Sequence, residues 1–173
     1  MLSFLIVGVL TAIVVYPIMH EFGHIAMAIL VNVDVVRICL FPFPCVVCEV
    51  NNNDIRQVFI SLGGIFFPYL FSMLFRPQNF WLWYANLLVK GIGTNGFFFS
   101  AIAIIFYENG NYQYMDDAIQ VLHFLPNGGS FFIVFLLVMG WYGVMRIIKE
   151  KPVSRCVSYL CFLPKKENCL LNY

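Results

Sequence analysis

Two histidines and a glutamate lie close together in the sequence His20-Glu21-Phe22-Gly23-His24. On an α-helix, residues four apart lie on the same face, so His20 and His24 can direct both imidazoles at one metal ion. The His-Glu-x-x-His spacing is typical of zinc hydrolases, in which the glutamate takes a proton from water and later passes it to a leaving amine. We therefore predict that His20 and His24 bind zinc and that Glu21 is the catalytic acid and base.

A catalytic zinc site generally has three protein ligands, so the histidine pair needs a partner from another part of the chain. The acidic or imidazole candidates beside an apolar segment are Asp116, Asp117 and His123. Asp117 is favoured because it begins a short hydrophobic helix, whereas Asp116 also suits a helix cap, and His123 suits a packing role. We predict one Zn²⁺ per chain, held by His20, His24 and Asp117, with Asp116 as the alternative third ligand.

The histidine cluster lies in one of the most apolar parts of the chain. Between Leu2 and Val31, Glu21 and the two histidines are the only ionisable acidic or basic side chains, and 61% of all residues are hydrophobic. Ionisable groups at membrane depth are costly and usually serve an ion, a proton or a substrate, which disfavours a chance polar patch. The composition predicts an integral membrane protein, and a net charge of +1 argues against a nucleic-acid partner.

The apolar segments predict an α-helical integral membrane protein with about four transmembrane helices and one short helix. The expected spans are 2–31, 58–75, 80–107 and 130–148, with the short helix at 118–125.

Three local features of these spans add detail. Pro17 predicts a kink in the first span, which is longer than a hydrocarbon core of about 30 Å requires. Gly63-Gly64 predicts close contact between the first two spans. The stretch from Lys90 to Gly96 is a poor helix former and favours a break in the third span, with Lys90 reaching towards the interface.

The segment from Asn32 to Arg56 has a different character. Its β-branched runs flank Phe41-Pro42-Phe43-Pro44 and predict a β-hairpin or small strand insertion after the first helix. Strand edges cannot face lipid, so this segment should lie at the interface or line a cavity, where its edge offers pairing to an extended peptide. The chain lacks a secreted, loop-rich character, so we expect its cysteines, including Cys45 and Cys48, to be reduced.

The domain organisation follows from these segments. We predict a single membrane-embedded domain over residues 1–150, with 32–56 as its insertion, and a basic, cysteine-containing tail over 151–173. Short basic flanks tend to stay on the cytoplasmic side, so the C-terminus is predicted to be cytoplasmic. The basic residues in or just before the tail are Arg146, Lys149, Lys151, Arg155, Lys165 and Lys166.

The chain resembles the intramembrane zinc metalloproteases of the site-2 protease family. The resemblance is carried by the His20 to His24 motif on an early span, by Gly63-Gly64 at the start of the next, and by Asp117 late in the chain. In that family a downstream aspartate, usually in Leu-Asp-Gly, supplies the third ligand, and an asparagine stands some eight residues before it. Asn109 stands eight residues before Asp117, which implies that Asn109 contacts the substrate or the transition state.

The resemblance implies a zinc-dependent intramembrane endopeptidase that acts in regulated intramembrane proteolysis in a bacterial cell membrane. Its partners would be a transmembrane protein or peptide substrate and the lipid bilayer, and the class also allows a regulatory membrane partner. The alternative is a zinc-binding membrane protein without protease activity, either a metal transporter or a degenerate scaffold. A transporter should carry more intramembrane carboxylates or a histidine-rich loop, and a scaffold should have lost Glu21.

Overall fold

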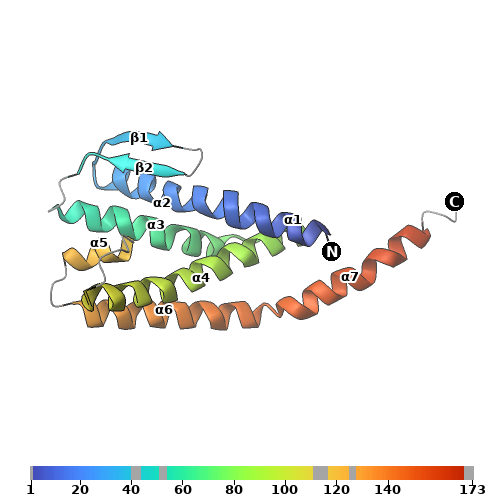
Figure 1. Cartoon of the computed structure of the whole chain (residues 1–173). Helices are drawn as coiled ribbons and strands as arrows, with labels where there is room; N and C mark the ends of the chain where they lie inside the picture. The colour runs from blue at the N-terminus through green and yellow to red at the C-terminus, as the bar shows by residue number, and fades with distance from the viewer. Residues whose placement is uncertain (1, 40–43, 51–53, 111–116, 125–127, 170–173) are drawn as a thin grey trace.

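The molecule is an α-helical bundle with a small sheet on one side (Figure 1). The computed structural model describes residues 2–39, 44–50, 54–110, 117–124 and 128–169, with side-chain environments as far as Cys161. Within these residues, 4 helices are long and apolar enough to cross a membrane. They cover Leu2–Leu30, Ile55–Leu74, Phe80–Glu108 and Gly129–Cys161. The predicted fold class is therefore confirmed.

The first span contains an irregular turn next to its proline. It comprises α1 (Leu2–Leu10), the π-helical turn η1 (Thr11–Val15) and α2 (Tyr16–Leu30). Pro17 lies in the first turn of α2, where its missing N–H interrupts the regular hydrogen-bond ladder. The irregularity therefore falls where the sequence predicted a kink, and the His20 to His24 motif follows it on α2.

The strand insertion forms a two-stranded antiparallel sheet beside α2 (Figure 1). It consists of β1 (Val35–Cys39) and β2 (Cys45–Cys48), with a register irregularity between Val35 and Arg37. Cys39 and Cys45 are register partners with Cα atoms 4.8 Å apart, and their sulfurs form a disulfide. The prediction of reduced cysteines is wrong for this pair, because strand pairing brings the two side chains together.

The second and third spans are each capped by a polar side chain. The carboxylate of Asp54 accepts a hydrogen bond from the Arg56 amide (2.9 Å) and begins α3 (Ile55–Leu74). Asn79 accepts one from the Leu82 amide (2.8 Å) and begins α4 (Phe80–Glu108).

The predicted break in the third span is wrong, because α4 is continuous. A Cβ placed on Gly93 would lie 3.4 Å from the Cβ of Tyr69, at ordinary van der Waals distance, so α4 packs against α3 at this residue. Lys90 is also buried, at 3% exposure, and forms an ion pair with Glu150 at the end of α6. Tertiary packing and a charge partner thus override the poor local helix propensity.

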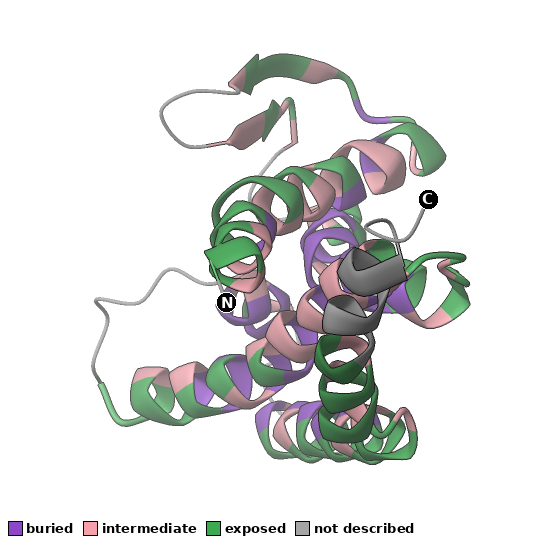
Figure 2. Cartoon of the chain, turned by 90° about the vertical axis from the view of Figure 1, so that its right-hand side faces the viewer, coloured by how far each residue is buried: buried purple, intermediate pink, exposed green. Residues whose placement is uncertain are grey.

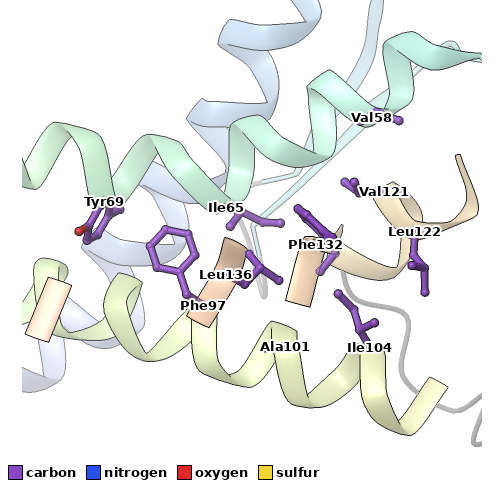
Figure 3. Close-up of a cluster of buried hydrophobic side chains, with 11 residues drawn as sticks. Val58, Ile65, Tyr69, Phe97, Ala101, Ile104, Val121, Leu122, Phe132 and Leu136 are labelled. Carbon is purple, nitrogen blue, oxygen red and sulfur yellow. The ribbon is translucent and has the colours of Figure 1, made fainter. Parts of the chain in front are cut away.

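The core lies between α3, α4, α5 (Asp117–His123) and α6 (Gly129–Lys149) (Figure 3). Buried residues lie mostly on the parts of the ribbon that face the interior of the bundle, and exposed residues lie mostly outside (Figure 2). Apolar residues of α5 pack into this core and fix the short helix beside the N-terminal half of α3 (Figure 1). Beyond α6, the predicted tail forms α7 (Pro152–Cys169), which extends away from the bundle.

Candidate metal centre

Close packing of α2 on α3 creates the space for the two histidines. A Cβ on Gly63 would lie 2.5 Å from the carbonyl oxygen of Gly23, so both positions require glycine. The predicted close contact between the first two spans is therefore confirmed. A Cβ on Gly64 would overlap the imidazole of His24 and come within 3.0 Å of Cε1 of His20. The glycine pair thus lets the helices approach and leaves room for the rings.

Three candidate ligand atoms converge at one point. His20 Nε2 and His24 Nε2 are 3.1 Å apart, and Asp117 Oδ2 lies 3.1 Å from the first and 3.3 Å from the second. Tetrahedral zinc with bonds of about 2.0–2.1 Å separates its ligand atoms by about 3.3 Å. The nitrogen and oxygen donors therefore have both the chemistry and the spacing of a three-ligand zinc site.

A hydrogen bond from α3 orients one of the imidazoles. His24 Nδ1 lies 2.8 Å from the carbonyl oxygen of Ile60, which can only accept. His24 Nδ1 therefore carries the proton, and Nε2 presents its lone pair towards Asp117 Oδ2 and His20 Nε2. Such outer hydrogen bonds are a common property of metal-binding histidines because they fix the tautomer and ring orientation.

Asp117 is ionised in this environment. Burial disfavours its charged form, but the interactions with the adjacent His20 and His24 imidazoles outweigh burial and lower the pKa of Asp117 to about 2. The carboxylate is therefore available as a metal ligand at neutral pH. Its position depends on α5, which the hydrophobic core holds against α3.

Glu21 lies beside the converging ligand atoms. The ligand atoms offered by His20, Glu21 and His24 all lie within 4.8 Å of one another. Glu21 and Val46 of β2 line the same cavity, so the sheet lies on the side of the centre that carries this carboxylate. Glu21 is thus close enough to share a water molecule with the metal centre.

The centre opens into a cavity of about 890 Å³. Its walls come from α2, β2, α3 and α5, and all four residues of β2 line it. Sequence reasoning missed three polar residues in these walls, namely Gln57, Ser61 and Gln120. Two signals in the sequence could have indicated them. Gln57 and Ser61 are polar side chains one turn apart at the start of the apolar α3, and Gln120 is a polar residue within the apolar α5.

The other predicted site residues have different positions. Asn109 caps the C-terminus of α4, where its Nδ2 donates to the Ile105 carbonyl (2.7 Å), and it is absent from the described cavity lining. The structure therefore does not bring Asn109 to the centre. His123 lines the cavity and lies 3.3 Å from the Tyr107 hydroxyl, outside the ligand cluster. Asp116 falls outside the described residues.

The fold and the centre together define an α-helical membrane protein with a candidate metal site between its first two spans and a short helix. Comparisons with known protein families, with curated proteins and with solved structures find no significant match. A functional interpretation therefore depends on the residues and geometry of this centre.

Proposed function

We propose that the protein is a zinc-dependent intramembrane endopeptidase that hydrolyses peptide bonds of membrane-spanning substrates. The observation that carries this proposal is the convergence of His20 Nε2, His24 Nε2 and Asp117 Oδ2 within 3.3 Å, beside Glu21. A carboxylate next to three ligand atoms at a cavity wall is what general acid and base catalysis of hydrolysis requires, and this favours a hydrolase over a transport or scaffold role.

The residues divide the chemistry among them. His20, His24 and Asp117 would hold the ion, which when bound supplies Lewis-acid polarisation and makes a water molecule more acidic. Glu21 would accept a proton from water during attack on the peptide carbonyl. It would then deliver that proton to the departing amine, so that the amine leaves as a neutral group.

The sheet offers a way to hold the substrate. A peptide bond inside a transmembrane helix is protected by helical hydrogen bonds, so hydrolysis requires an extended segment. β1 pairs with one edge of β2, and β2 also lines the cavity next to Glu21. An extended peptide that pairs with the other edge of β2 would therefore pass close to the catalytic glutamate.

The proposal includes a location. Four apolar spans fit an integral membrane protein, and we place it in a bacterial cell membrane with the basic C-terminal region in the cytoplasm. A regulatory membrane partner that controls substrate entry is compatible with this placement.

The test is to purify the protein, measure bound zinc, and compare cleavage of a transmembrane reporter by wild type and Glu21→Gln. We expect one zinc per chain in both proteins and a loss of cleavage rate of about 10²–10⁴-fold in the variant. Glu49→Gln is a matched control, because Glu49 is exposed and lies outside the cavity lining. Equal behaviour of wild type and Glu21→Gln, with zinc retained, would contradict the enzyme proposal and support a metal-binding protein without protease activity.

A further inference from the structure

Three polar side chains form a hydrogen-bonded network on the cavity wall. Gln57 Nε2 donates to Gln120 Oε1 (2.7 Å), and Ser61 Oγ donates to the same oxygen (2.9 Å). Gln57 and Ser61 are one turn apart on α3, whereas Gln120 is on α5, and all three line the cavity. Because Ser61 is only 1% exposed, the network is anchored in the protein interior.

The network leaves a donor and an acceptor for a ligand. Both lone pairs of Gln120 Oε1 are used, so its NH₂ group and the Oε1 of Gln57 remain, and neither bonds to another described residue. If both amides are turned over, Gln57 supplies the free donor and Gln120 the free acceptor. Either arrangement leaves one amide donor and one amide acceptor on residues that line the cavity, and these are the two kinds of group that bind the C=O and N–H of a peptide backbone.

The location of the network links it to the metal centre. Gln120 lies one turn after Asp117 on the same short helix, so the two side chains share a face of α5. Ser61 directly follows Ile60, whose carbonyl orients His24. The network and the candidate ligands are therefore supported by the same two helices, and β2 lines the same cavity.

We propose that Gln57 and Gln120 form a subsite that binds the main chain of an extended peptide next to the metal centre, with Ser61 fixing their arrangement. This inference rests on the proposed function. The subsite recognises the backbone, so it would accept substrates of different side-chain sequence. It would also provide a contact of the kind that the resemblance assigned to Asn109, which the structure places at a helix end.

The test measures peptide binding in the non-cleaving Glu21→Gln protein, with and without the added pair Gln57→Leu and Gln120→Leu. Replacing both glutamines avoids leaving one amide without its partner, and the Ser61 hydroxyl can turn to the main-chain carbonyl of residue 57, one helical turn before it. Two transmembrane peptides of unrelated side-chain sequence serve as ligands. We expect both dissociation constants to rise by about 10-fold with unchanged zinc content. Gln78→Leu is the control, because Gln78 is exposed and lies outside this cavity.

Three other results of this binding experiment would contradict the proposed subsite. Unchanged binding would show that the glutamines do not contact the peptide, and weaker binding of one peptide alone would indicate side-chain recognition. Loss of zinc would mean that the network only positions Asp117. The proposed function fails separately, when wild type and Glu21→Gln do not differ in cleavage. If wild type cleaves but the double leucine variant binds both peptides normally, only the subsite is wrong.

Discussion

At the scale of single residues, the proposed third ligand, Asp117, is the decisive position. Asp117 Oδ2 lies within 3.3 Å of both histidine Nε2 atoms. We expect Asp117→Ala to weaken zinc binding by more than about 100-fold, because it removes a direct ligand, whereas Asp116→Ala should retain zinc. Competition with a calibrated chelator measures both affinities. The reverse result, with zinc lost only from Asp116→Ala, would transfer the ligand role to Asp116.

Gly64 gives a second residue-level prediction. A Cβ at this position would overlap the His24 ring and crowd His20. We expect Gly64→Ala to lower zinc affinity and to reduce the free energy of unfolding by about 1–3 kcal/mol, as overpacking usually does. Gly91→Ala is the control, because a Cβ there meets nothing within 4 Å. Chelator competition and unfolding in detergent test the pair, and equal behaviour of the two variants would contradict the packing argument.

Some site residues could be predicted from the sequence and others could not. His20, Glu21 and His24 are local, since one helical turn brings them together whatever the rest of the fold does. The contact of Gln57 with Gln120 joins residues 63 positions apart, and no local pattern specifies it. Asn109 was assigned by its spacing to Asp117, but the end of α4 uses its side chain as a cap.

At the scale of elements, hydropathy and turn residues were sufficient for the four spans and the strand insertion. The break in α4 was wrong because Gly93 packs against Tyr69, a contact that local propensity does not contain. The sequence analysis assigned no secondary structure to the tail, and α7 covers most of it. Elements defined by long apolar runs were thus predictable, whereas those decided by packing partners were not.

The start of α3 gives a prediction for an element. Hydrogen bonds from Arg56 lower the pKa of Asp54 below its usual 3.8, so the charged cap stabilises the folded state above that pH. This contribution is lost as the pH falls through the lowered folded-state pKa. We expect Asp54→Ala to lower the unfolding temperature at about pH 5, and the difference from wild type to shrink towards about pH 3. A pH-independent difference would contradict the charge argument, and Asp54→Asn should retain most of the cap.

At the scale of the whole molecule, a buried ion pair connects α4 to the end of α6, which lies far from α5 (Figure 1). The Lys90 side chain on α4 is 4% exposed and pairs with Glu150, at the junction of α6 and α7. The second oxygen of Glu150 accepts a hydrogen bond from Trp83 Nε1 (3.2 Å). This network therefore ties α4 to the point where the chain leaves the last span.

Removing one charge of this pair should cost more stability than removing both. Lys90→Met leaves Glu150 without its cation in a partly buried place, and we expect the free energy of unfolding to fall by about 3 kcal/mol. Adding Glu150→Gln should recover much of this loss, because the amide can still accept the bond from Trp83. Lys149→Met, at an exposed position, should change little. Unfolding in detergent measures all four proteins, and a double variant no more stable than Lys90→Met would show that the two charges do not stabilise each other.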